Sequence, residues 1–112
     1  MTLNHETFKE WNIIVLEGNF TVSNLYLVRS EFEKLENKPR PLIAVDLLHA
    51  TNVDSSAIGL LTNFSKRIEK KNGSLVVFNV RDDIEYILKL VNFEDIVRVF
   101  PSRADFEAAA VI

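Results

Sequence analysis

The residues of this sequence best suited to chemistry are three neighbours, Asp54, Ser55 and Ser56. They follow an apolar, strand-like run and precede an amphipathic stretch, so a helix beginning at Ser55 would hold the serine hydroxyls at its positive end. An aspartate at the N-cap position accepts hydrogen bonds from the next backbone amides, which explains the triplet as ordinary helix capping. A phosphoryl group on a serine there would add about −1.5 to −2 charges, which the helix amides tolerate. The triplet therefore predicts a helix cap or, alternatively, a modification site that changes docking and preserves the fold.

The other acidic and histidine side chains do not form a catalytic or metal-binding pattern. Asp46 stands inside a predicted strand and Asp54 at a predicted cap, and no base, nucleophile and orienting group converge on them. His5 and His49 are isolated, whereas a metal site needs about three or four clustered ligands. The three glycines of the chain cannot make a glycine-rich phosphate loop. We therefore expect no enzymatic activity, no metal and no cofactor.

Length, charge and cysteine content narrow the class of protein further. The 112 residues suit one domain, residues 1–112, with one core. A net charge of −3 argues against a general nucleic-acid binder, so the basic stretch at 66–71 is expected to be a solvated helix face. The sequence has no cysteine, no signal-peptide pattern and no apolar run of about 20 residues. We expect a cytoplasmic protein with no nucleic-acid partner and no membrane insertion.

The segments around the triplet have the pattern of a βαβ unit. Residues 42–47 are almost continuously apolar, which is typical of a strand covered on both faces, and residues 49–53 are expected to connect it to the helix. Residues 55–71 combine an apolar stripe with a charged face, and Asn72-Gly73 is expected to end that helix with the glycine in the left-handed conformation. Residues 74–80 form the next buried strand. Strand, helix and strand in this order predict a parallel pair.

The flanking segments add further strands and helices. Before the unit we expect a weak strand at 6–9, its hairpin partner at 11–17, a break at Gly18-Asn19 and a helix at 24–36. After the unit we expect a helix capped by Asp82 or Asp83 with Ile84, Ile87, Leu88 and Val91 inward, a strand at 96–100 and a last helix after Pro101-Ser102. The prediction is an α/β fold in which a mixed, mainly parallel sheet of about four to five strands is backed by about four helices. At this length a single helical layer on one face is expected.

Leu60 is an apolar side chain whose place the pattern leaves open. It falls beside the stripe that contains Ile58 and Leu61, toward the flank of the predicted helix. If the stripe is wide, Leu60 belongs to the core. If it is exposed, it forms an apolar contact point near Ser56, as a phosphate-sensitive interface requires.

Val45-Asp46-Leu47, followed by the run at 53–61, is similar to the strand, connection and Asp-Ser-Ser-Gly-Leu-Gly motif of a known family. The chain resembles STAS-domain proteins of the anti-sigma factor antagonist (anti-anti-sigma factor) type. Gly73 with the strand after it, and the apolar positions at 87–106, follow the order seen in that family. The resemblance covers about residues 7–109 and implies a compact fold in which a mixed sheet is backed by helices.

The resemblance also implies a regulatory switch. The unphosphorylated antagonist binds an anti-sigma factor that is also a GHKL-type serine kinase and so frees a sigma factor. The kinase then phosphorylates a serine of the motif, which ends the interaction, and a PP2C-type phosphatase restores it. By motif position Ser56 is the phosphoacceptor, with Asp54 and Ser55 beside it in the docking loop. The expected partner-binding residues are Asn52, Asp54, Ser55, Ser56, Ala57, Leu60, Phe20 and Thr21.

Two departures from the family pattern distinguish this chain. Ala57 stands where the family often has glycine, which is a mild change because alanine is a good helix former. Gly18-Asn19-Phe20-Thr21 stands where the family commonly has Gly-Glu-Leu-Asp, so both acids near the phosphoserine are replaced by neutral side chains. These replacements bear on the choice of partner and kinase. An alternative role for the same scaffold is a subunit of a larger signalling or transport complex.

Overall fold

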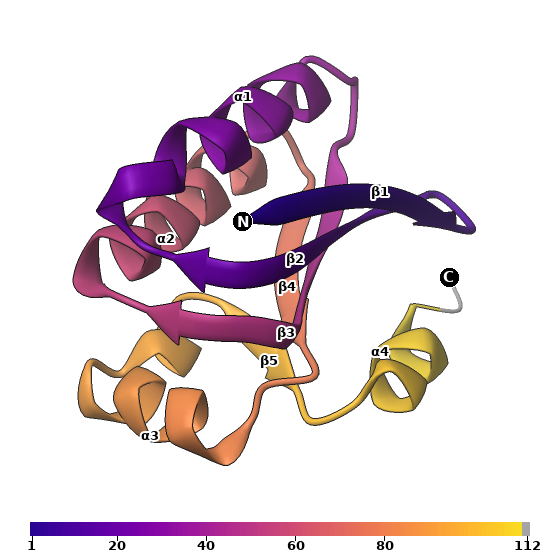
Figure 1. Cartoon of the computed structure of the whole chain (residues 1–112). Coiled ribbons are helices and arrows are strands. Elements are labelled where there is room, and N and C mark those ends of the chain that lie inside the picture. Colours follow the sequence, from indigo (N-terminus) through magenta and orange to yellow (C-terminus); the bar gives the residue numbers. More distant parts are fainter. Residues whose placement is uncertain (111–112) are drawn as a thin grey trace.

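The computed structural model describes residues 1–110, whose strands form one five-stranded sheet (Figure 1). The strands are β1 Thr2–Phe8, β2 Trp11–Phe20, β3 Leu42–Val53, β4 Ser74–Phe78 and β5 Arg98–Phe100. They lie across the sheet in chain order, with β1 antiparallel to β2 and every later pair parallel. The predicted hairpin, the parallel pair and the mixed, mainly parallel sheet are therefore confirmed. β1 begins earlier than the predicted strand at 6–9.

Four α-helices and two short 3-10 helices lie between or after the strands within the described residues. They are η1 Val22–Asn24, α1 Leu25–Glu36, α2 Ser55–Glu69, α3 Asp82–Leu90, η2 Phe93–Asp95 and α4 Arg103–Ala109. α2 forms because its apolar residues recur at helical spacing: Ile58, Leu61 and Ile68 are buried, whereas Lys66 and Lys70 are exposed. The predicted helices are confirmed, and α2 ends two residues before its predicted boundary.

The helices cover both faces of the sheet, so the prediction of a single helical layer on one face is wrong. α1, α2 and α3 bury their apolar faces on one side, in a core cluster that includes Ile14, Val45 and Val77. The alternate residues of the same strands point to the other side, where α4 packs (Figure 1). The ring of Phe106 from α4 stacks on Phe78 with centroids 5.0 Å apart. Strands that are apolar on both faces need cover on both, and one short helix supplies the second cover.

β2 and β3 both continue beyond their predicted ends. The predicted break at Gly18-Asn19 and the predicted connection at 49–53 are wrong, because these two segments pair with each other as parallel strands. The register shifts between Gly18 and Asn19, and Gly18 takes φ +94°, a conformation that glycine adopts without strain. Asn19 thereby lies beside Asn52 in the sheet. The extension brings the end of β2 next to the start of α2.

Gly73 has a different role from the predicted one. The left-handed residue at the end of α2 is Asn72, with φ +60°, and Gly73 itself has no positive φ. A Cβ at Gly73 would lie 2.1 Å from the carbonyl oxygen of Pro41, so the close approach of the backbones excludes a side chain. The same carbonyl accepts a hydrogen bond from the amide of Ser74 at 2.9 Å. Glycine is needed at the point where β4 joins β3.

α3 departs from the prediction at its cap and on its inner face. Arg81 stands at the N-cap, and Asp82 and Asp83 are the first two helical residues, where their charge favours the positive end of the helix. Ile84 and Leu88 are buried as predicted, but Ile87 and Val91 are exposed. Because α3 lies at the border of the core, only some of its apolar residues are buried. The last strand, β5, is also shorter than the predicted 96–100.

Candidate functional site

The carboxylate of Asp54 joins the beginning of α2 to the beginning of η1. Its Oδ1 accepts a hydrogen bond from the amide of Ala57 at 2.9 Å, which confirms the predicted N-cap. Its Oδ2 accepts a second hydrogen bond from the amide of Val22 at 3.0 Å. The Asp54 amide in turn donates to the carbonyl of Phe20 at 3.4 Å. One side chain therefore satisfies amides of two helices and holds the end of β2 against the start of α2.

Ser55 and Ser56 occupy the first two positions of α2 and differ in exposure. Ser55 is exposed, Ser56 is half-buried, and Ala57 after them is buried. The amides of a first helical turn have no partner within the helix, so the backbone here favours an anion. A phosphoryl group on either serine would also lie close in sequence to the Asp54 carboxylate, which repels it. A phosphoryl group at this helix start would therefore be favoured by the free amides and repelled by the Asp54 carboxylate.

A cluster of neutral polar side chains surrounds this helix start. Asn19 Oδ1 accepts hydrogen bonds from Thr51 Oγ1 and Asn52 Nδ2, each at 2.7 Å. Asn24 Nδ2 donates to the carbonyl of Asn19, and Asn24 Oδ1 accepts from the amide of Thr21 at 2.9 Å. These four bonds tie η1 to the ends of β2 and β3. The neutral Asn19 is thus an integral part of the surface, and its amide oxygen is used twice.

Three residues expected in the docking surface have buried side chains, so the prediction is wrong for them. Phe20 and Ala57 are fully buried and Leu60 is 5% exposed, so none of these side chains contributes to that surface. Leu60 lies on the side of α2 that also carries Phe64 and Arg67, which contact Phe32 and Glu36 of α1. Packing of α1 along this flank places Leu60 in the core. Of its two possible places, the structure shows the buried one.

Several exposed apolar side chains escaped the sequence analysis, and one of them, Val22, lies beside the triplet. Val22 is 66% exposed and its amide is bound to Asp54. Leu48, which is 44% exposed, lies where β3 has passed the last residue paired with β4, and its carbonyl accepts from Arg81 at 3.1 Å. Tyr86 of α3 is 67% exposed. Whether such a side chain is exposed depends on where the neighbouring elements end, and the hydrophobic periodicity of the sequence does not indicate that.

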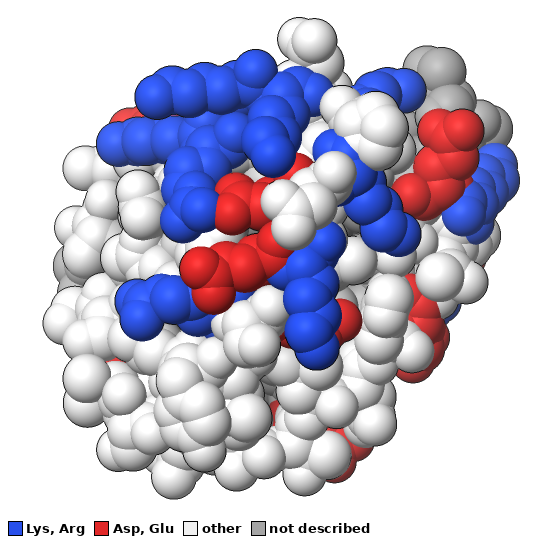
Figure 2. Space-filling view, turned by 90° about the horizontal axis from the view of Figure 1, so that it is seen from above, with Lys and Arg blue, Asp and Glu red and all other residues white. Residues whose placement is uncertain are grey.

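The basic residues at 66–71 lie at the far end of α2 from the triplet. A helix of 15 residues places its ends about 20 Å apart. Arg67 pairs with the carboxylate of Glu36, and Lys71 Nζ donates to the carbonyl of Glu36 at 2.6 Å. Lys and Arg side chains gather in one part of the face in Figure 2, with acidic side chains between them. Cations at helix C-termini are stabilised by the helix dipole, which accounts for those at the end of α2.

Two acidic side chains outside the triplet, Asp46 and Asp83, have structural partners. Asp46 Oδ1 accepts from the amide of Leu48 at 3.0 Å and from Asn79 Nδ2 at 3.2 Å, so it stabilises the turn beyond β4. A hydrogen bond from Arg81 lowers the pKa of the Asp83 carboxyl. Residues 1–110 contain no group of three or more possible metal ligands. None of their helices has the length and apolar character needed to cross a membrane.

Several known proteins are similar to this chain in sequence or in structure. The chain is 29% identical to a STAS-domain-containing protein of Pseudomonas aeruginosa over 86 residues, which are 77% of this chain and 84% of that protein. The structure resembles an anti-sigma factor antagonist from Mycobacterium paratuberculosis with a TM-score of 0.86 and 15% identity, covering 96% of this chain and 92% of that one.

Two further solved structures share the fold. Phosphorylated SpoIIAA of Bacillus matches with a TM-score of 0.73 and 14% identity, covering 96% of this chain and 99% of that one. The murine anion transporter Slc26a9 matches with a TM-score of 0.68 and 19% identity, covering 89% of this chain and 18% of the transporter. The sequence profile of the STAS domain family matches residues 3–106, which is most of the sequence. The chain therefore belongs to the STAS domain family.

Proposed function

We propose that this protein is an anti-sigma factor antagonist, a binding protein controlled by phosphorylation. The observation that carries the proposal is the serine pair at the exposed start of α2, beside a carboxylate that fixes the local backbone. When unmodified, this surface binds an anti-sigma factor of the GHKL-type serine kinase class and keeps it from its sigma factor. The protein itself catalyses nothing, because the kinase supplies ATP, metal and base. We place this exchange in the bacterial cytoplasm, where ATP is available.

The docking surface consists of the accessible residues around the helix start. Thr21 and Asn52 contribute polar groups beside Asp54 and the two serines. The exposed side chain of Val22, whose amide is bound to Asp54, adds apolar area. Such a composition, polar at the centre with an apolar neighbour, suits an interface that phosphate can disrupt.

The phosphoacceptor is one of the two serines. The family motif favours Ser56, whereas the exposure of the hydroxyls favours Ser55, because a kinase must reach the side chain. Phosphate on either residue adds about −1.5 to −2 charges next to Asp54. Like charges brought together at an interface cost several kcal/mol, so the phosphorylated form is released. A PP2C-type phosphatase returns it to the binding state.

Kinase assays on single-serine variants test this proposal. The protein, Ser55→Ala, Ser56→Ala and the double variant are incubated with the cognate kinase and ATP, and phosphate is located by intact mass and peptide mapping. We expect one phosphate on the wild type and none on the double variant. The single variant that stays unmodified identifies the acceptor. Phosphate that persists undiminished in the double variant would refute the assignment of the switch to this site.

A second candidate is a STAS scaffold in a larger signalling or transport complex. The structural match to part of a transporter supports it, although at 19% identity that match concerns the fold. Affinity capture from the source cell separates the two. Recovery of a GHKL-type kinase supports the antagonist, and recovery of transport subunits supports the scaffold.

A further inference from the structure

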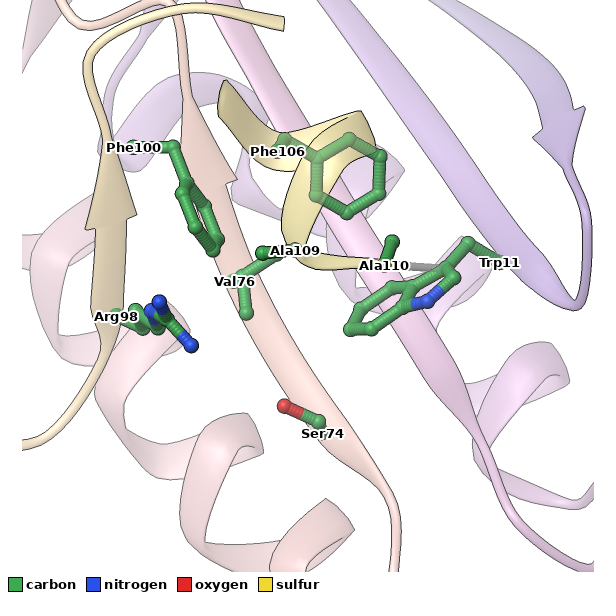
Figure 3. Close-up of a pocket in the computed structure, with 8 residues that line it drawn as sticks. All are labelled: Trp11, Ser74, Val76, Arg98, Phe100, Phe106, Ala109 and Ala110. Carbon is green, nitrogen blue, oxygen red and sulfur yellow. The ribbon is translucent and has the colours of Figure 1, made fainter. Parts of the chain in front are cut away.

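A pocket lies between the sheet and α4, on the face of the sheet opposite α2 (Figure 3). Its volume is about 90 Å³. Val76 of β4 forms its floor, and Trp11, Phe100 and Phe106 supply aromatic walls. The remaining wall is the end of α4, where the small side chain of Ala109 leaves space. The pocket is mostly apolar and is built from four separate segments of the chain.

Two polar side chains of the pocket, Arg98 and Ser74, lie away from its aromatic centre. Figure 3 shows the guanidinium of Arg98 and the hydroxyl of Ser74 on the same side of Val76, away from the ring of Phe106. The Arg98 guanidinium lies over the ring of Phe100, with its Cζ 4.5 Å from the centroid. Arg98 is exposed and forms no ion pair with a carboxylate among residues 1–110; the same is true of Arg29 and Arg40. Unlike those two, Arg98 stacks on Phe100 at the edge of the pocket, which holds its guanidinium where it can receive an anion.

We propose that this pocket binds a small aromatic carboxylate of about the size of benzoate. The ring would lie on Val76 between Trp11 and Phe100, and the carboxylate would accept hydrogen bonds from Arg98 and Ser74. The pocket, about 90 Å³, is smaller than the dry apolar cavity of about 150 Å³ that is known to hold benzene. It therefore encloses only part of the ring, and because it is open on one side the rest of the ring and the charged group remain partly in water. Drug-sized ligands need pockets of roughly 300 Å³ or more, which excludes a nucleotide. The proposal is independent of the proposed antagonist function, because it concerns the other face of the sheet.

Trp11 makes a direct test possible, because it is the single tryptophan of the chain. Benzoate is titrated into the full protein while the Trp11 fluorescence and the indole N–H resonance are recorded. We expect a saturable shift with a dissociation constant on the order of 0.1–1 mM. Benzyl alcohol, which has the same ring without the charge, is expected to bind at least about tenfold more weakly, since it cannot form the charge-assisted bonds.

Variants identify the contacts. Arg98→Gln is expected to weaken benzoate binding about tenfold or more and to leave the weak binding of benzyl alcohol unchanged. Ala109→Leu, which fills the pocket, is expected to abolish binding of both molecules. Arg29→Gln, on exposed α1 at the other face, is the matched control and keeps full binding. All variants are first compared with the wild type by thermal melting.

Three results would overturn the proposal. The first is the absence of any saturable shift of Trp11 up to about 10 mM benzoate, which is above the weakest expected constant. The second is equal benzoate binding by wild type and Arg98→Gln. The third is full binding by Ala109→Leu when its melting curve shows that it is folded.

Discussion

Replacement of Asp54 by alanine removes two hydrogen bonds that the structure assigns to one carboxylate. The bond to the Ala57 amide caps α2, and loss of an N-cap costs about 1 kcal/mol. The bond to the Val22 amide lies in an exposed region, and its net contribution is also about 1 kcal/mol. Asp54→Ala is therefore expected to lower the free energy of unfolding by about 2 kcal/mol.

Urea denaturation followed by circular dichroism and by Trp11 fluorescence measures this effect. With a slope of about 2 kcal/mol per molar urea, the midpoint is expected to fall by about 1 M. The melting temperature is expected to fall by about 8 °C for a chain of this size. Both probes are expected to report one transition, because the capped helix belongs to the main core.

Two matched variants show which bond is responsible. Asp54→Asn keeps a side-chain oxygen for the Ala57 amide but loses the second acceptor, so it is expected to cost about half as much as Asp54→Ala. Glu33→Ala removes one negative charge from an exposed position on α1 and is expected to change stability by less than about 0.5 kcal/mol. If Asp54→Ala costs no more than Glu33→Ala, the structural role given to the carboxylate is wrong.

Three further predictions concern other parts of the fold. Gly73→Ala forces a Cβ to within 2.1 Å of a carbonyl oxygen and is expected to lower the free energy of unfolding by at least about 1–3 kcal/mol. Gly59→Ala, in open space on α2, is expected to raise it by about 0.5–1 kcal/mol. Phe106→Ala is expected to lower it by about 3–5 kcal/mol, measured by urea denaturation, because it empties the centre of the apolar cluster between the sheet and α4. The pKa of Asp83, lowered from 3.8 by Arg81, is expected to rise in Arg81→Gln when followed by carboxyl NMR.

The sign of the Asp83 effect follows from the direction of its shift. A carboxyl whose folded pKa lies below its ordinary value contributes stability above that ordinary value, here 3.8, and loses it as the pH falls through the folded pKa. The group is exposed, so its contribution to stability is small. An unchanged Asp83 titration in Arg81→Gln would show that the contact does not form in solution.

Local chemistry was sufficient to predict the elements with strong patterns. The apolar run at 42–47 and the stripe through Ile58, Leu61 and Ile68 predicted the strand and the helix that hold the triplet. Asp54 at the N-cap followed from the preference of carboxylates for free amides. The serine pair followed as a candidate site from its position alone, because two hydroxyls at the first turn of a helix face outward unless something covers them.

Pairing between distant segments was not readable from the sequence. The residues at 18–20 and 49–53 look like turns, because glycine, asparagine and threonine break a local apolar pattern. They become strands because each satisfies the backbone groups of the other. The same pairing brings Asn19 to Thr51 and Asn52 and so creates the polar cluster at the site.

The sequence alone determined the helices, the central parts of the strands and the position of a serine pair at a helix start, since these depend on neighbours a few residues apart. The tertiary structure decided the burial of Phe20 and Leu60 and the exposure of Val22 and Leu48, because burial depends on which elements pack beside a side chain. It also decided the place of α4: strands that are apolar on both faces must be covered on both, but the sequence pattern does not indicate which helix covers the second face. The pocket beside Trp11 exists for that reason, because a short helix covers the second face incompletely.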